Sequence, residues 1–508
     1  MNKMKKETRA SEEKKTMIKG DWVVGFNGKS HVLIQDGAVV YQGDRILWIG
    51  QNHDFPEPVD RCVEGKGQVI IPGLINMHSH AAVHTGELVA ADAGRTDLFN
   101  SAILSFLPTH GVDVKSSIEV SDEDYLLGSK FAFCEMVKAG STTIVEIGNI
   151  GATVDIVGSN TRRFVDIVDE VGFRAYLSPG FGSETMQYDR GGRIIFVPNE
   201  KDGFDQLETA VKFIQENAGA ADGRVQGMLF PVIDLCCSLN LLRESASAAE
   251  SLDVRMQTHC AEALFDHHEC LRRNKMSLVE YLAEADWLGP RAILGHALFT
   301  SVHPWSVYPH GRDLELISKS GASVAHCPTV FGRRGLALHS FQRYQDAGIN
   351  MVLGTDTYPM DIISEMRHAA YIGRVLDGDF ASASSKAVFE AATINAAQAL
   401  GRDDLGRLAP GAKADIVSVN MDQIAIGPYL DPIRALVNCA SGRDVEMVIV
   451  DGTTILEGRH LSRVDEHEIF EDAKRITERD LAKLLSENWP GKSLEEVAPP
   501  SFPIVKAL

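Results

Sequence analysis

The chain has 508 residues, a formal net charge of −20 and an ordinary apolar content of 44%. So acidic a composition argues against nucleic acid or an anionic membrane as partner, because phosphate groups bind basic surfaces. No apolar run approaches the roughly 20 residues of a membrane span. The charged N-terminal segment lacks the apolar core of a signal peptide. The eight cysteines are scattered without CxxC spacing. We therefore expect a cytoplasmic protein with reduced thiols.

Two β-rich segments lie at opposite ends of the chain. Residues 1–15 are strongly charged and predict a disordered tail. Short alternating apolar runs with Asp-Gly and Gly-Asp turns follow in 16–71, and a related pattern returns in 408–462. We expect these two segments to meet in one small flanking β-sandwich.

The middle of the chain, residues 72–407, alternates short apolar strands with helical segments. Eight such repeats predict an α/β fold, a (β/α)8 TIM-like barrel of parallel strands wrapped by helices. A doubly wound open sheet is the alternative, but it would not gather polar side chains from so many strand ends. The predicted strands are Val69–Asn76, Thr142–Glu146, Arg174–Ser178, Val225–Pro231, Arg255–His259, Ala292–Gly295, Ser323–His326 and Met351–Thr355.

Several other segments carry helix or loop signals. Ser121–Asp124 and Ser277–Glu280 are capping boxes, and Glu390–Gly401 has a helical pattern. Residues 463–508 predict a charged amphipathic helix and a tail. The stretch 81–120 is long for a connection between two barrel strands, and such loops commonly cover a pocket.

The segment VIIPGLINMHSH ends in His78 and His80. Side chains two residues apart on a strand point the same way, so both imidazoles would face the barrel axis at its carboxyl end. Two convergent histidines are half of a divalent metal site. The alternative is that His-x-His only caps a loop.

Further polar residues follow later strands. His259 and His296 end the fifth and sixth strands, Asp356 ends the eighth, and Glu262 comes three residues after His259. Each has a structural alternative, since a strand-end histidine often packs in a loop and a carboxylate often caps a helix. Their joint occurrence at strand ends of one barrel indicates a metal site.

These motifs together resemble the amidohydrolase superfamily, and within it the branch of chlorohydrolases, triazine hydrolases and cytosine-type deaminases. The resemblance covers most of the chain, in a fixed order. Its motifs are VIIPGLINMHSH, EMVKAGSTTIVE, QTHCAEA, ILGHA, VAHCP, GTD followed by EMRHA, EAATINAAQALG, GRLAPGAKADIV and VNCASGRDVEMVIVDG.

The resemblance implies that His78, His80, His259 and Asp356 are the ligands of one divalent ion, and that His296 contacts the attacking water or substrate. No lysine ends the strand VQGMLFP, so the carbamylated lysine that bridges two metals in other branches looks absent. Zinc is the expected ion, with iron(II), cobalt or manganese as alternatives. Relatives are commonly homo-oligomers. Candidate contacts to a small-molecule substrate are His84, Glu87, Arg95, His326, Phe331 and Tyr358.

The expected chemistry follows from these side chains. Three imidazoles and one carboxylate leave an ion with net positive charge and an open position, which lowers the pKa of water from near 16 to roughly 7. Asp356 would take the proton, His296 would hold the nucleophile, and Glu262 would protonate a ring nitrogen and then the departing amine. A leaving amine needs a proton and chloride does not. Glu262 therefore favours an aminohydrolase, or deaminase, acting on a C=N-containing small molecule or heterocycle.

Other functions on the same scaffold stay open. The alternatives are a hydrolase of amides, ureas or carbamates, a chlorohydrolase, and a non-catalytic metal-binding scaffold. Two departures from the family pattern argue against an adenosine-like substrate. Pro231 is followed by Val232, where such deaminases have histidine, and Phe331 stands where they tend to have asparagine.

Overall fold

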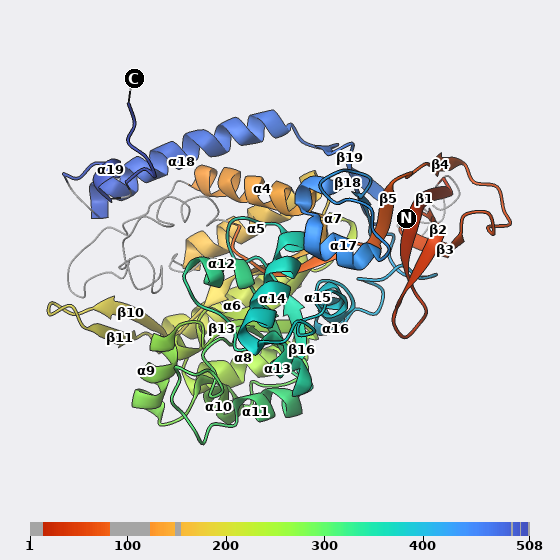
Figure 1. Ribbon diagram of the computed structural model, residues 1–508. Coiled ribbons are helices and arrows are strands. Elements are labelled where there is room, and N and C mark those ends of the chain that lie inside the picture. Colours follow the sequence, from red (N-terminus) through yellow and green to blue (C-terminus); the bar gives the residue numbers. More distant parts are fainter. Residues whose placement is uncertain (1–13, 82–121, 148–153, 489–490, 498, 506–508) are drawn as a thin grey trace.

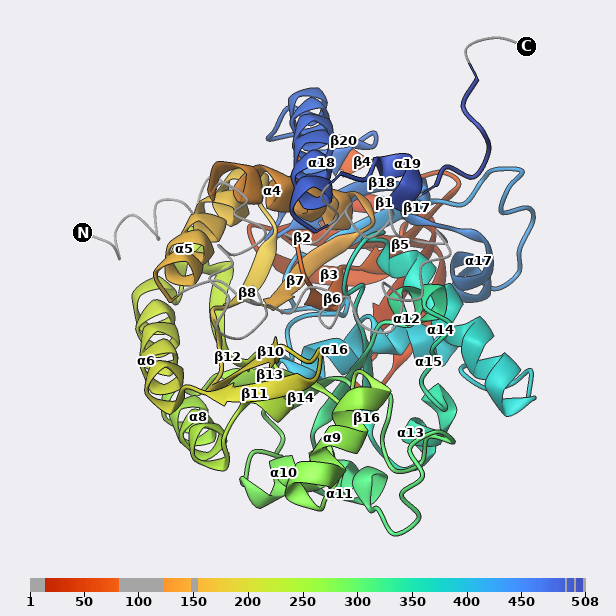
Figure 2. The same ribbon diagram turned by 90° about the vertical axis from the view of Figure 1, so that its left-hand side faces the viewer.

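The computed structural model describes residues 14–81, 122–147, 154–488, 491–497 and 499–505. Its centre is a barrel of eight parallel strands with helices around it, and Figure 2 shows most of this ring of helices. The predicted barrel is thereby confirmed. The barrel strands are β6 (Leu74–Ser79), β7 (Ser141–Ile147), β8 (Arg174–Ser178), β12 (Val225–Pro231), β13 (Arg255–Cys260), β14 (Ala292–His296), β15 (Ser323–His326) and β16 (Asn350–Leu353).

The interior of the barrel is filled by apolar side chains from these strands, among them Ile75, Val145 and Phe230. Side chains of α16 (Ile394–Ala399) belong to the same cluster. A barrel of this width is a packed core and not a pore. Polar chemistry is therefore confined to the ends of the strands.

The barrel closes where its first strand meets the segment after its last strand. The backbone N–H groups of Thr355 and Asp356 donate to the carbonyl of His78 over 3.0 and 2.9 Å, and His80 N–H donates to the carbonyl of Asp356 over 2.7 Å. We call these three hydrogen bonds the closing seam. The seam lies among the predicted metal ligands themselves.

The predicted strand Val69–Asn76 is wrong in one respect, because it is two strands. β5 (Gln68–Pro72) pairs with β1 and β17 in the flanking sheet, and only β6 enters the barrel. Gly73 separates them. A Cβ at this position would lie 2.1 Å from Thr142 Oγ1, so only glycine fits where the chain crosses between the two sheets.

The flanking sheet has nine strands and is built from both ends of the chain, as predicted. In Figure 1 its red and blue strands lie side by side next to the barrel. Branched and aromatic side chains such as Val23, Val39 and Ile416 form its core. Its strands are β1 (Thr16–Phe26), β2 (His31–Gln42), β3 (Arg45–Gln51), β4 (Arg61–Val63), β5, β17 (Ile416–Asn420), β18 (Val445–Val450), β19 (Thr453–Glu457) and β20 (His460–Leu461).

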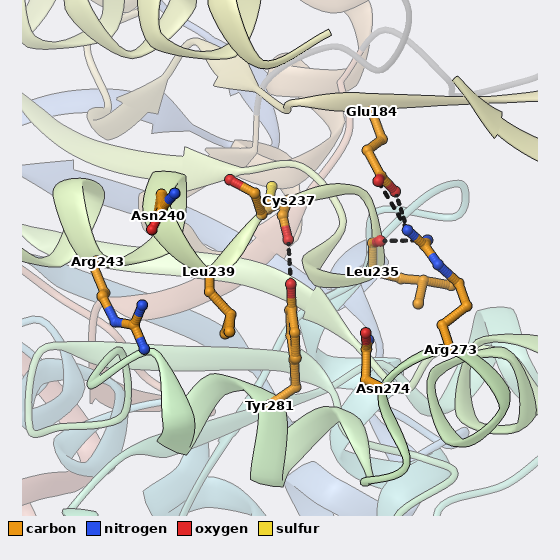
Figure 3. Close-up of a pocket in the computed structure, with 10 residues that line it drawn as sticks. Glu184, Leu235, Cys237, Leu239, Asn240, Arg243, Arg273, Asn274 and Tyr281 are labelled. Atoms are coloured by element: carbon orange, nitrogen blue, oxygen red, sulfur yellow. Dashed lines mark hydrogen bonds and ion pairs between the residues drawn. The ribbon is translucent and has the colours of Figure 1, made fainter. Parts of the chain in front are cut away.

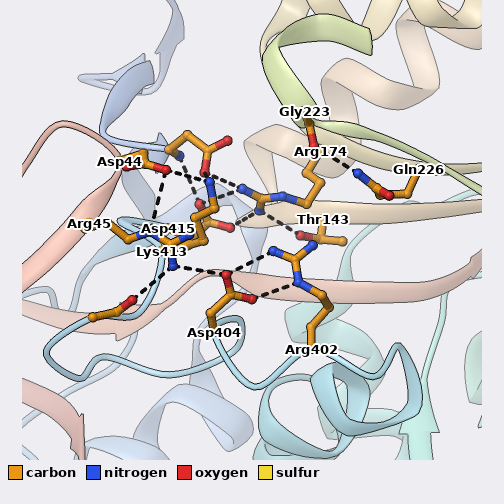
Figure 4. Close-up of polar contacts among 12 residues, drawn as sticks. Asp44, Arg45, Thr143, Arg174, Gly223, Gln226, Arg402, Asp404, Lys413 and Asp415 are labelled. Carbon is orange, nitrogen blue, oxygen red and sulfur yellow. Dashed lines mark hydrogen bonds and ion pairs between the residues drawn. The ribbon is translucent and has the colours of Figure 1, made fainter. Parts of the chain in front are cut away.

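A buried ion network joins the flanking sheet to the barrel (Figure 4). Arg174, at the start of β8, donates to Asp415 and to Asp451, the second over 2.5 Å. The guanidinium is only 1% exposed, so these carboxylates supply the charge that makes its burial tolerable. Lys413 Nζ contacts Asp451 at 2.9 Å. The segment Gly411–Asp415 therefore anchors the two units to each other.

The helices follow the predicted pattern with one correction. Ser277 and Glu280 form the predicted capping box, with hydrogen bonds of 3.1 and 3.0 Å, whereas Ser121 lies outside the described residues. The predicted helix Glu390–Gly401 is two helices, α15 (Ser385–Ala391) and α16, because Thr393 leaves helical geometry and its hydroxyl donates to the carbonyl of Phe389. Among the described residues no helix is both long and apolar enough to cross a membrane.

The remaining helices cover the barrel and carry its loops. The predicted C-terminal helix is α18, which packs along α4 (Figure 1). The helices other than α15 and α16 are α4 (Asp122–Lys138), α5 (Val154–Val171), α6 (Glu200–Asn217), α7 (Ala220–Gly223), α8 (Leu239–Leu252), α9 (Leu264–Asn274), α10 (Leu278–Glu284), α11 (Asp313–Ser320), α12 (Pro328–Arg333), α13 (Phe341–Asp346), α14 (Ile362–Asp377), α17 (Pro432–Cys439), α18 (Glu466–Asn488) and α19 (Leu494–Val497).

Candidate active site

The register of the barrel strands places the predicted ligands next to one another. His259 is paired with Gly295 across β13 and β14, and Cys260 with His296. The closing seam adds His78, His80 and Asp356 at the same end. Nitrogen and carboxylate atoms of His78, His80 and Asp356 lie within 4.8 Å of one another, and so do those of His78, His259 and His296. We call these five residues the metal cluster.

His78 is oriented by a residue of a neighbouring strand. Its Nδ1 lies 2.6 Å from Gln257 Oε1, and the amide of Gln257 donates to the Met77 carbonyl over 3.0 Å. Because Gln257 Oε1 can only accept, Nδ1 of His78 carries the proton. The Nε2 atom of His78 is buried and has no hydrogen-bond partner among the described residues. A buried lone pair without a partner is what a metal ion would satisfy.

His80 and His259 face each other with their Nε2 atoms 3.0 Å apart. His259 donates from Nδ1 to the Val232 carbonyl over 2.6 Å, and His80 hydrogen-bonds the backbone of Ile147. Both Nε2 atoms therefore present lone pairs to the same point. This separation is close to that of two ligands with metal–nitrogen bonds of about 2.0 Å. A shared cation fits this arrangement and two neutral rings alone do not.

Asp356 and His296 complete the metal cluster. Asp356 Oδ1 lies 3.8 Å from His80 Nε2, and Oδ2 lies 3.6 Å from His296 Nε2. Asp356 has a φ of 63°, a left-handed conformation that aspartate tolerates better than most residues. Both ring nitrogens of His296 are buried and make no hydrogen bond within the described part of the chain. Nε2 faces the same carboxylate that the resemblance assigns to the metal.

Burial keeps the imidazoles of His78, His80 and His296 neutral. It lowers the pKa of His78 and of His296 well below the usual value, with repulsion from the neighbouring histidines as a further cause. The pKa of His80 falls to about 3 for the same reasons, burial first and His259 second. Metal ligands must be deprotonated, so a neutral cluster is ready to bind a cation.

Two glycines leave the space that His78 occupies. A Cβ at Gly354 would lie 2.6 Å from His78 Cβ, and a Cβ at Gly295 would lie 2.7 Å from His78 Nδ1. Any side chain at either position would push the histidine out of place. Gly295 and Gly354 are thus required for the position of His78 in the site.

Glu262 lies beside the metal cluster, in the loop between β13 and α9. The capping function considered for Glu262 belongs to Asp266, whose Oδ2 accepts the Ala263 N–H over 2.9 Å. Glu262 Oε1 instead lies 3.8 Å from Arg334 Nη1, and both side chains are largely buried, at 15% and 14% exposed. The carboxylate is therefore not used as a helix cap.

The structure also shows positioning residues that were not predicted. Glu146 accepts the Ala81 N–H at 3.1 and 3.0 Å and the Ser79 hydroxyl at 3.1 Å, which fixes the segment around His80. Asn76 Nδ2 donates to Thr355 Oγ1 over 2.8 Å, beside the closing seam. Asn76 and Gln257 each come two residues before a ligand on the same strand. This spacing is the sequence pattern from which Asn76 and Gln257 could have been predicted as positioning residues.

The predicted substrate contacts are placed in part. Phe331, on α12, is buried against His296 with the ring centroids 4.6 Å apart. His326 ends β15, and burial lowers its pKa to about 3. Tyr358 is half-buried, and its carbonyl accepts from Arg333 over 2.6 Å. The other three, His84, Glu87 and Arg95, lie outside the described residues.

A separate cavity of about 360 Å³ lies between β10 (Glu184–Tyr188), α8, α9 and α10, away from the metal cluster (Figure 3). Two pairs of its lining residues are bonded to each other. Arg273 contacts both oxygens of Glu184 at 2.8 and 2.7 Å, and the Tyr281 hydroxyl donates to the Cys237 carbonyl over 3.0 Å. These bonds attach β10 to the barrel's outer helices, so we give the cavity a structural role.

The barrel, the neutral histidine cluster and the carboxylates define a metal-dependent hydrolase. The amidohydrolase family model matches residues 69–455. The chain belongs to the amidohydrolase family.

Curated relatives are similar over most of the chain. A 5-methylthioadenosine/S-adenosylhomocysteine deaminase of Halothermothrix orenii is 26% identical and covers 92% of this chain and 100% of its own. A 5'-deoxyadenosine deaminase of Methanosarcina acetivorans is 27% identical and covers 89% and 95%.

Solved structures share the fold. An adenosine deaminase of Xanthomonas campestris with bound zinc has a TM-score of 0.75 at 20% identity and covers 92% of this chain and 98% of its own. The zinc complex of atrazine chlorohydrolase from Arthrobacter aurescens TC1 has a TM-score of 0.74 at 22% identity and covers 91% and 100%. Both the barrel and the flanking sheet therefore belong to a known arrangement.

Proposed function

We propose that the protein is a metal-dependent aminohydrolase that releases ammonia or an amine from a small heterocycle containing a C=N bond. The observation that carries the proposal is the juxtaposition of the neutral histidine cluster with Asp356 and the nearby Glu262 at one end of the barrel. The names of the relatives support the same reaction, since they are deaminases.

The residues that would hold the ion are His78, His80 and His259 through Nε2, and Asp356 through its carboxylate. The buried unpartnered Nε2 of His78 and the facing Nε2 atoms of His80 and His259 fit a divalent cation. We propose zinc, which the structural neighbours with bound metal contain. A bound divalent ion would lower the pKa of water and supply a nucleophile at neutral pH.

The side chains around the ion divide the proton transfers. Asp356 accepts the proton of the attacking water, and His296, whose ring nitrogens make no hydrogen bond to any described residue, holds that water or the substrate. Glu262 donates a proton to the ring nitrogen as the attacked carbon becomes tetrahedral. The proton that Asp356 took from the water then goes, by way of Glu262, to the departing amine, which leaves only when protonated. A similar division between a metal site and a non-ligand glutamate operates in zinc nucleobase deaminases of another fold.

The two residues at which the sequence departs from adenosine-type deaminases lie beside the metal cluster, where we propose that the substrate binds. The Val232 carbonyl binds His259, and the Phe331 ring packs on His296, so both departures touch the metal cluster. The relatives nevertheless act, by their names, on 5'-deoxyadenosine and 5-methylthioadenosine. We propose an aminated heterocycle as the substrate class and take these nucleosides as its first candidates.

A panel assay tests this function. The zinc-loaded protein is incubated with 5'-deoxyadenosine, 5-methylthioadenosine, adenine, cytosine and aminated triazines, and ammonia release is measured. Atrazine and simple amides, ureas and carbamates are included, with chloride and amine detection. Ammonia release that is lost in Glu262→Gln and in His78→Ala is expected. Chloride release or amide cleavage without ammonia release would replace the proposal with one of its alternatives.

Two further properties are inferred. All eight cysteines are free, which fits a reducing compartment, and we propose a cytoplasmic location. We also propose a homo-oligomer, which sedimentation of the purified protein would test. Neither property enters the proposed reaction.

A further inference from the structure

The short helix α12 is held in place at both ends. At its start, the Thr329 N–H donates to Glu365 Oε2 over 3.1 Å, and the Thr329 hydroxyl lies 2.6 Å from His368 Nδ1. At its end, Arg333 Nη1 donates to the Tyr358 carbonyl over 2.6 Å, two residues after Asp356. The position of α12 is thereby fixed against α14 and against the loop that carries Asp356.

From this fixed helix two side chains reach the active site. Phe331 packs against His296, as described above. Arg334, the residue that ends α12, points to Glu262 with 3.8 Å between Nη1 and Oε1. Arg333, its neighbour, binds the backbone of Tyr358 instead. The two adjacent arginines therefore have different tasks.

The charges around Glu262 explain why an arginine is useful there. Asp266 is a partly buried acid whose pKa rises to about 7 through desolvation and the nearby charge of Glu262. Asp356 lies in the metal cluster of the same site. These carboxylates repel one another, and an opposite charge offsets that repulsion more strongly in a poorly exposed site than at the surface.

We propose that Arg334 is a positioning residue that holds the carboxylate of Glu262 at the edge of the site, facing the substrate; this rests on the proposed role of Glu262 as proton donor. A separation of 3.8 Å is an ion pair but too long for a hydrogen bond. Glu262 is thus attracted by the guanidinium without losing a lone pair to it. The carboxyl oxygen that faces Arg334 is therefore not held as a hydrogen-bond acceptor, and the group can still carry the proton that it transfers.

The test compares Arg334→Met, Arg334→Lys, Glu262→Gln and the double variant Arg334→Met/Glu262→Gln. Steady-state ammonia release is measured with 5'-deoxyadenosine, or with the panel member that is turned over fastest. We expect Arg334→Met to lower kcat roughly tenfold while KM changes by less than about twofold. Arg334→Lys should recover most of the loss. Because Arg334 acts through Glu262, the double variant should be no slower than Glu262→Gln alone.

Arg272→Met serves as the matched control. It removes an arginine that pairs with Glu269 at 2.6 Å on the exposed surface of α9, and it should leave kcat unchanged. Zinc content and thermal unfolding are measured for every variant, so that a loss of metal or of folding is seen directly. Should Arg334→Met fail to fold, Arg334→Gln makes the same test, because it removes the charge and keeps hydrogen-bonding atoms.

The outcomes separate this inference from the proposed function. If Glu262→Gln keeps full ammonia release, the proposed proton donor is wrong. If Glu262→Gln is inactive while Arg334→Met equals the wild type, only the inference fails. A rise in KM with unchanged kcat, or a further loss in the double variant, would show that Arg334 contacts the substrate directly and would also overturn it.

Discussion

Gln257 fixes the tautomer of His78. Its amide donates to the Met77 carbonyl over 3.0 Å, so its oxygen must accept the Nδ1 proton of His78 at 2.6 Å. The lone pair on Nε2 is then available at the centre of the metal cluster. One glutamine, two residues before His259 on β13, thereby prepares a ligand on another strand.

Replacing Gln257 should weaken metal binding without unfolding the barrel. We expect Gln257→Leu to lower zinc affinity about 10- to 100-fold, because partners of this kind orient the ligand and raise its basicity. Competition with a chromophoric chelator measures the affinity. Gln226→Leu is the control, since Gln226 lies on the neighbouring strand β12 and, among the described residues, its side chain donates to the Gly223 carbonyl. Equal affinities in the two variants would contradict the role given to Gln257.

A methyl group at Gly354 should displace His78. The added Cβ would lie 2.6 Å from His78 Cβ and 2.7 Å from its backbone, and the strand cannot move because it forms the closing seam. We expect Gly354→Ala to lose zinc and ammonia release and to be destabilised by about 1–3 kcal/mol. Gly289→Ala is the control, because no atom of the described chain lies within 4 Å of its added Cβ. A Gly354→Ala protein with normal zinc content would refute the steric argument.

The buried ion network should contribute strongly to stability. Asp415→Asn leaves the guanidinium of Arg174, only 1% exposed, without one of its two carboxylates. Removing one partner of a buried pair costs about 3–5 kcal/mol. Urea unfolding followed by tryptophan fluorescence measures the loss. The comparable change in the exposed pair Arg61–Glu457, Glu457→Gln, should cost less than about 1 kcal/mol. Similar midpoints for the two variants would show that the network contributes little.

His31 should make the protein sensitive to mild acid. It lies between Phe26 and Phe389 and bonds Thr393 Oγ1 at 3.1 Å, and burial lowers its pKa from 6.5 to about 4. Between these pH values the unfolded chain binds a proton that the folded chain does not. Stability therefore falls as the pH drops through this window, by about 3 kcal/mol in total. The wild type should lose more stability than His31→Gln between pH 7 and pH 4. Parallel losses would rule out His31 as the cause.

The sequence alone was sufficient to predict that the five side chains of the metal cluster gather at one end of the barrel, because they coincide with strand ends, and a barrel brings such ends together. Their role as metal ligands stays a prediction. His78, His80, His259, His296 and Asp356 could be recognised from local patterns of strand and polar residue. The crossing at Gly73 was missed because both halves of Val69–Asn76 are equally apolar, and only the approach of Thr142 shows that they belong to different sheets.

Contacts between distant parts of the chain left no local signal. Glu262 could be proposed as an acid from its place after His259, but its pairing with Arg334 follows only from where α12 docks. The break between α15 and α16 at Thr393 also depends on a contact with a distant segment, which the local sequence does not show. Threonine is compatible with a helix in sequence, and its side chain here is held by His31 from the flanking sheet.

The closing seam has a consequence for how the protein matures. Hydrogen bonds between His78, His80 and Asp356 help to close the barrel. A cation bound by the side chains of the same residues would therefore also stabilise the closed barrel. The protein with zinc and the protein without zinc would then differ in the stability of the closed barrel as well as in activity. Amide protons at this joint should exchange with solvent fastest when zinc has been stripped away, while the flanking sheet keeps its protection.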